Sequence, residues 1–130
     1  MLTMHNLQIH KNFKEEDFAC KCGTGCGKGY KDMDEKFMTK VFELRDMSGL
    51  PMTVTSGYRC PKHPESLKRP ASAHVGGFAI DFKVTSSQAA FTFMMCALKV
   101  GLVRIGWNQK YDFFHIDGAP HLPQNVLFKY

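Results

Sequence analysis

Apolar and polar residues alternate from Phe78 to Val84, which predicts a strand with one buried face. Phe78, Ile80, Phe82 and Val84 share that face, so Asp81 points to the opposite one. The same criterion predicts shorter or weaker strands over residues 52–55, 102–105, 111–117 and 125–128. Asp81 is therefore expected on the open side of a half-buried strand.

Apolar residues at helical spacing predict two main helices. The first follows Asp32, which forms a capping-box pattern with Glu35, and ends before Gly49. The second runs from Thr85 to about residue 100. The apolar stripe of the first helix comprises Phe37, Met38, Val41, Leu44 and Met47.

Glycine and proline mark the segments between these elements. Residues 20–30 form a glycine-rich loop, residues 60–73 a long proline-containing loop, and residues 106–110 a turn. Residues 1–12 are a lead-in segment, either an arm or an edge strand. Helices and strands intermingle without a helix after every strand, which predicts an α+β fold with a largely antiparallel sheet. We expect one domain over residues 1–130, without a separate wall-binding domain.

Composition narrows the class of protein. Hydrophobic residues make up 44% and charged residues 22% of the chain, as in globular proteins, and no apolar run is long enough to insert into a membrane. The N-terminal residues lack the apolar core of a secretory signal. The net charge of +5 suits an anionic partner, such as a cell wall or a nucleic acid, or equally a lysine-rich solvated surface.

Two clusters of histidine and aspartate carry the chemistry. His74 and Asp81 flank a Gly-Gly pair that can fold the imidazole back beside the carboxylate. The second cluster is Asp112–Asp117, with His115 inside it. Neutral imidazole and carboxylate are ligands that suit zinc, so a third ligand from the second cluster would complete a site.

Three motifs in a fixed order resemble one family of enzymes. They are Ser56-Gly57-Tyr58-Arg59, Ser72-x-His74-x-x-Gly77-x-Ala79-x-Asp81 and Asp112-x-x-His115-x-Asp117. Together they resemble the zinc D-Ala-D-Ala carboxypeptidases, a family that includes phage L-alanyl-D-glutamate endolysins and vancomycin-resistance dipeptidases. The Hedgehog signalling domain is similar to this family. The resemblance covers residues 13–117 and implies a fold of the same type.

The resemblance implies a catalytic zinc ion (Zn²⁺) bound by His74, Asp81 and His115. Two imidazoles and one carboxylate leave a coordination position open, as catalytic zinc sites require. Bound zinc would lower the pKa of water and polarise the scissile carbonyl. Arg59, in the position of the family's arginine, is expected to stabilise the oxyanion.

The resemblance also implies that Asp112 is the general base, because the family places an acidic residue three positions before the last histidine. In a regular strand Asp112 and His115 face opposite sides, whereas Asp117 and His115 share a face. Asp112 can therefore act only if the strand begins or bulges after it, and Asp117 is the alternative base. Ser72 and Asp117 are otherwise expected to orient the ligands or the substrate.

The leading functional prediction is a monomeric zinc peptidase that cuts peptidoglycan stem peptides, encoded by a phage or prophage. It would be made in the host bacterial cytoplasm and reach the wall through a holin or with the virion, without inserting into a membrane or binding nucleic acid. The scissile bond, D-Ala-D-Ala or L-Ala-D-Glu, stays open, as does endo- versus carboxypeptidase action. The rival hypotheses are a non-catalytic zinc-binding module and a basic nucleic-acid-binding protein.

The chain has five cysteines, an odd number that argues against a complete disulfide framework. Cys96 lies in an apolar run and is expected in the core. The remaining cysteines are either ligands of a structural zinc ion or reduced thiols in a glycine-rich loop. They are Cys20, Cys22, Cys26 and Cys60.

Overall fold

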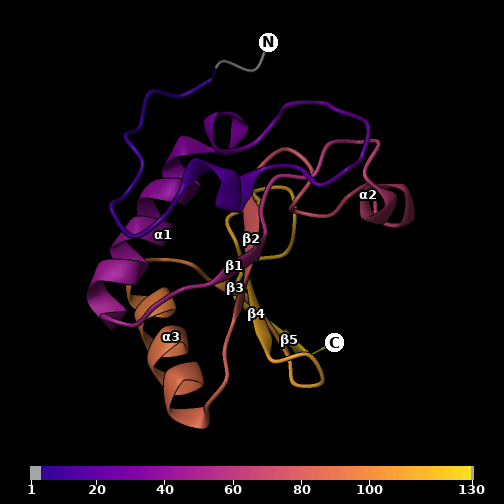
Figure 1. The fold of residues 1–130 in the computed structure, drawn as a ribbon. Coiled ribbons are helices and arrows are strands. Elements are labelled where there is room, and N and C mark those ends of the chain that lie inside the picture. The colour runs from indigo at the N-terminus through magenta and orange to yellow at the C-terminus, as the bar shows by residue number, and fades with distance from the viewer. Residues whose placement is uncertain (1–3, 130) are drawn as a thin grey trace.

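A five-stranded sheet runs through the centre of the protein (Figure 1). The computed structural model describes residues 4–129. The strand order is β1-β2-β4-β3-β5, with β1 at Val54–Ser56, β2 at Ala79–Lys83, β4 at Phe113–Asp117, β3 at Arg104–Asn108 and β5 at Val126–Lys129. Neighbouring strands are antiparallel, except that β3 and β5 pair in parallel.

Two long helices, α1 (Glu35–Ser48) and α3 (Ser87–Lys99), pack side by side on one face of this sheet (Figure 1). Phe93 of α3 meets Phe82 of β2 edge to face, with ring centroids 4.9 Å apart. Phe82 in turn packs against Phe114 of β4. This apolar layer between helices and sheet is the core, and it confirms the predicted α+β fold with a mostly antiparallel sheet.

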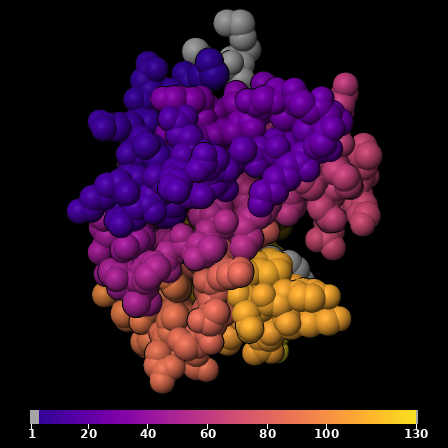
Figure 2. Space-filling model, in the orientation of Figure 1, coloured from indigo at the N-terminus to yellow at the C-terminus, as the bar shows by residue number. Residues whose placement is uncertain are grey.

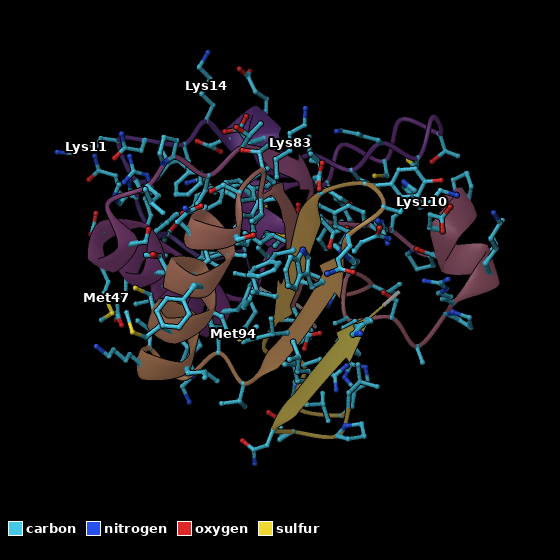
Figure 3. All side chains as sticks on the ribbon, turned by 90° about the horizontal axis from the view of Figure 1, so that it is seen from below. Lys11, Lys14, Met47, Lys83, Met94 and Lys110 are labelled. Atoms are coloured by element: carbon cyan, nitrogen blue, oxygen red, sulfur yellow. The ribbon has the colours of Figure 1, made fainter. Side chains whose placement is uncertain are left out.

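The other elements are short. Two 3-10 helices, Glu15–Phe18 and Tyr30–Asp32, lie in the N-terminal part, and α2 (Pro64–Lys68) stands apart from the other two α-helices (Figure 1). No helix within residues 4–129 has both the length and the apolar character needed to cross a membrane. Lys11, Lys14, Lys83 and Lys110 lie on separate parts of the surface (Figure 3).

Both long helices begin later than the sequence predicts. The carboxylate of Asp34, not Asp32, caps α1 by accepting a backbone hydrogen bond from three residues further on. Asp32 belongs to a 3-10 helix of its own, so it lacks the extended backbone of an N-cap. The hydroxyl of Ser86, not Thr85, caps α3. Gly49 ends α1 with φ 66°, as predicted.

Several segments differ from the expected boundaries. The predicted turn at residues 106–110 is wrong in its first half, because β3 continues to Asn108 and pairs with β4. The long loop at residues 60–73 contains α2. Met47 is half exposed and lies outside the buried stripe of α1. Residues 4–12 form an arm without a strand, and residues 1–3 lie outside the described residues.

Candidate metal centre

Three buried side chains converge beside the sheet: His74, Asp81 and His115. Nε2 of His74 lies 3.3 Å from Oδ1 of Asp81, and Nδ1 of His115 lies 3.0 Å from the same oxygen. One ligand atom from each residue lies within 4.8 Å of the other two. A tetrahedral zinc ion, with bonds of about 2.0–2.2 Å, holds its ligand atoms about 3.3 Å apart. The donor set therefore fits zinc in chemistry and in spacing.

The sheet register places two of these ligands together. Asp81 in β2 and His115 in β4 are direct partners across an antiparallel pair. His74 comes from the turn before β2, where the backbone N–H of Gly77 donates to the His74 carbonyl. Gly77 has φ 83°, and a Cβ there would lie 2.7 Å from Cα of Met33. Only glycine allows this turn to close against the preceding segment.

The second nitrogen of each imidazole is held by a partner outside the ligand set. Nδ1 of His74 donates to the carbonyl oxygen of Gly57 at 2.9 Å, which leaves Nε2 with a free lone pair. Nε2 of His115 lies 2.6 Å from Oδ2 of Asp117, so a proton on Nε2 leaves Nδ1 free to bind a metal. Such contacts fix the tautomer and the ring orientation of metal-binding histidines.

Asp117 is itself anchored. Its Oδ1 accepts hydrogen bonds from Nε of Arg104 at 2.7 Å and from the backbone N–H of Ala119 at 3.2 Å. The Asp117 side chain is completely buried. The sequence analysis missed Arg104, because only the β3–β4 register reveals it as the direct partner of Asp117. This ion pair holds the carboxylate that orients His115.

Electrostatics in the cluster favour an ionised carboxylate. Burial raises the pKa of Asp81, but the contacts with His115 and His74 outweigh burial and hold that pKa below its usual range. Burial lowers the pKa of His74, and Asp81 opposes this only in part. Burial also lowers the pKa of His115, but the contacts with Asp117 and Asp81 raise it above its ordinary value. These opposite shifts favour a neutral His74 and a more basic His115, so a metal ion would compete with a proton mainly at His115.

A model of the Peptidase M15 family matches residues 11–117, which is more than half of the chain. The chain belongs to the Peptidase M15 family. This confirms the resemblance found in the sequence motifs. M15 peptidases are zinc-dependent metallopeptidases, which agrees with the donor set of His74, Asp81 and His115. A comparison with curated proteins gives no match.

In this M15 family member the three candidate ligand residues line a cavity of about 840 Å³. One wall comes from the segment around α2 and the other from the segment before β4. Figure 2 shows the surface hollowed between these two segments. The walls include Glu65, Arg69 and Ser72 on one side and Asn108, Tyr111 and Phe113 on the other.

Arg59 also lines this cavity. Its Nη2 lies 3.6 Å from Oδ2 of Asp81, and its backbone N–H donates to the carbonyl oxygen of His74. The buried Nε of Arg59 has no hydrogen-bond partner among residues 4–129. An unpaired buried donor costs free energy, so a shift of the side chain that pairs this N–H would be favourable. The structure thus brings Arg59 together with the ligand set.

Asp112 lies outside the cluster of candidate ligands. It is exposed, has φ 54°, and does not line the cavity, although Tyr111 and Phe113 on either side of it do. Its backbone carbonyl accepts from Val84, which fixes the start of β4. Ser72, by contrast, lines the cavity and its hydroxyl accepts from the backbone N–H of His74.

Proposed function

We propose that this M15 peptidase hydrolyses an amide bond in peptidoglycan stem peptides. The observation that carries the proposal is the convergence of two imidazoles and one carboxylate, with fixed tautomers, in an 840 Å³ cavity open to solvent. Such a cavity has room for a short peptide.

His74 Nε2, Asp81 Oδ1 and His115 Nδ1 are the atoms that would hold the zinc ion. Zinc bound there would supply a Lewis acid for the scissile carbonyl and lower the pKa of water. Gly57 and Asp117 keep the two imidazoles oriented throughout. These contacts require no rearrangement during the reaction.

Arg59 is proposed to bind the carbonyl oxygen as negative charge develops on it. Its place in the cavity lining, with Nη2 3.6 Å from Oδ2 of Asp81, supports this role. The cavity also contains Arg69 and Arg104. Stem peptides carry free carboxylates, so a cavity with several guanidinium groups suits such a substrate.

Asp112 is proposed as the general base, which would take the proton of the attacking water and return it to the leaving amine. Among residues 4–129 its carboxylate has no hydrogen bond or ion pair, so it is free to rotate towards the cavity. Both oxygens of Asp117 are already bound, to Arg104, Ala119 and His115. Asp117 would have to give up these bonds to accept a proton, so we assign it the orienting role.

We further propose that the protein is a monomeric phage or prophage lysis enzyme, released to the wall through a holin or carried by the virion. The motif resemblance to phage endolysins is the support for this role. It implies synthesis in the bacterial cytoplasm and action outside it. Producing the protein inside bacteria with and without a co-produced holin tests the need for release: only the cells with the holin should lyse.

A non-catalytic zinc-binding module is the second candidate function. The position of Asp112 outside the cavity lining favours it, because a metal site without a base can bind but not turn over. The presence of Arg59 beside the ligands favours catalysis instead.

The deciding experiment combines zinc content with digestion of purified peptidoglycan, with released peptides identified by mass spectrometry. The parent should bind zinc at this site and release peptides, His115→Ala should lose the zinc of this site together with peptide release, and Asp112→Asn should keep zinc and lose turnover. If the zinc-loaded parent releases nothing from several wall types, the enzymatic proposal fails and the binding module remains. If Asp112→Asn is as active as the parent, the base assignment is wrong.

A further inference from the structure

Four of the five cysteines meet beside the segment that carries Arg59, because Cys60 directly follows Arg59 in the chain. Cys20, Cys22 and Cys26 come from the glycine-rich loop, and Cys60 from the segment after β1. One sulfur from each lies within 4.8 Å of the other three, and all are free thiols. We infer that these four cysteines bind a structural zinc ion, separate from the catalytic centre.

The sulfur spacing fits a tetrathiolate site. Zinc–sulfur bonds of about 2.3 Å in a tetrahedron place the sulfurs about 3.8 Å apart. Six sulfur–sulfur distances, all below 4.8 Å, meet this requirement with small adjustments. Two separate disulfides would instead give two bonded pairs rather than one cluster of four. Soft thiolates favour zinc over calcium or magnesium, and four protein ligands leave no position for water.

The glycine-rich loop repeats one local turn that presents a sulfur. In Cys22-Gly23-Thr24 the backbone N–H of Thr24 donates to Sγ of Cys22 at 3.3 Å. In the second turn the N–H of Lys28 donates to Sγ of Cys26 at 3.5 Å. The glycine between cysteine and donor is left-handed in both, with φ 75° and 71°. This conformation directs the amide at the sulfur, the kind of contact that orients metal ligands.

A hydrogen bond from a backbone N–H to a sulfur also connects the glycine-rich loop to the segment after β1. The backbone N–H of Cys60 donates to Sγ of Cys20 at 3.2 Å. The residue before it, Arg59, donates its backbone N–H to the carbonyl of His74, and Gly57 accepts from Nδ1 of His74. A zinc ion in the cysteine cluster would therefore fix the segment that positions Arg59 and His74.

Charge near the cluster also suits a metal–thiolate centre. Four thiolates around Zn²⁺ carry a net charge of about −2. Lys21 and Lys28 belong to the same loop; the side chain of Lys28 is half exposed and its Nζ lies 3.8 Å from Oδ1 of Asp32. Basic side chains close in sequence partly offset the excess negative charge.

Zinc stoichiometry of the intact protein tests the inference. Elemental analysis should give two zinc ions per chain in the parent and one in His115→Ala. Cys26→Ser should also retain one, whereas Cys96→Ala, which changes the buried fifth cysteine in α3, should retain two. The zinc ion lost in His115→Ala is the one at the catalytic centre, and the zinc ion lost in Cys26→Ser is the one in the cysteine cluster.

A spectroscopic measurement covers the case in which Cys26→Ser does not fold. Cobalt is loaded into His115→Ala, where only the cysteine cluster remains as a site. An intense thiolate-to-cobalt charge-transfer absorption supports the inference, because imidazole and carboxylate ligands do not produce it. One zinc ion in the parent, none in His115→Ala and no such absorption would overturn it. Recovery of the four cysteines as two disulfides from a reducing preparation would also overturn it, and neither result affects the proposed peptidase function.

Discussion

The buried carboxylate of Asp117 offers the sharpest test of how the metal centre is held. Asp117→Asn keeps the shape of the side chain and an oxygen that can accept from Arg104 and Ala119. It replaces the oxygen facing Nε2 of His115, 2.6 Å away, with an amide donor. His115 must then move its proton to Nδ1, the atom that faces Asp81 and would bind zinc.

The size of the effect follows from these contacts. Loss of an orienting carboxylate weakens metal binding about 10–100-fold, or about 1.4–2.8 kcal/mol. Hydrogen bonds to charged groups contribute about 1.5–3 kcal/mol and neutral ones about 1 kcal/mol. Because the Asp117 side chain is fully buried, solvent does not screen this difference at the Arg104 bond. We therefore expect the unfolding free energy to fall by about 1–2 kcal/mol.

Zinc affinity is measured by competition with a chromophoric chelator, and stability by urea unfolding of the metal-free protein. Asp46→Asn is the matched control, because Asp46 contacts His10 at 2.7 Å but is 67% exposed. An exposed pair contributes less than about 1 kcal/mol, so the control should bind zinc like the parent. Parent-like zinc affinity in Asp117→Asn would refute the orienting role. Lost turnover with full zinc affinity would instead identify Asp117 as the base.

Four further predictions concern the same proposed centre. Gly57→Ala should destabilise the protein by about 1–3 kcal/mol in urea unfolding, because the new Cβ lies 2.7 Å from Cα of Phe18; unchanged stability would contradict the close approach. The raised pKa of His115 predicts that zinc binding releases a proton from this imidazole even above the ordinary pKa of histidine, measured by calorimetry in two buffers of different ionisation enthalpy. In the metal-free protein, the stabilisation from protonated His115 is complete below its ordinary pKa and is lost as pH rises through the raised value, so urea stability should fall over that range. Zinc at 100 times its dissociation constant should raise the free energy of unfolding by about 2.7 kcal/mol, and a chelator should abolish this increase. Equal melting temperatures with and without chelator would exclude a bound metal.

The proposed ligand set could be predicted from the sequence because the patterns that indicate it are local. Alternation around Asp81 assigned its face, and the Gly76-Gly77 pair predicted the turn that returns His74. The fold class followed from the same periodicities and from the order of helices and strands. Such patterns depend on neighbours within a few residues, which sequence displays directly.

Other features depend on register and on competition between neighbouring residues. Arg104 joins Asp117 only through the β3–β4 pairing, and no local pattern encodes that alignment. Asp32 and Asp34 are both good N-caps, and the 3-10 turn at Asp32 decided between them. The exposure of Asp112 follows from a left-handed residue before β4, which sequence does not reveal for aspartate.

The position of β2 and β4 inside the sheet has a consequence for motion. Each is hydrogen-bonded on both sides, so their amides should exchange with solvent only when most of the sheet opens. The cavity wall around α2 is a loop segment outside the sheet, and its amides should exchange through local opening. The wall that receives a substrate can thus open and close while Asp81 and His115 stay fixed on strands that do not move with it.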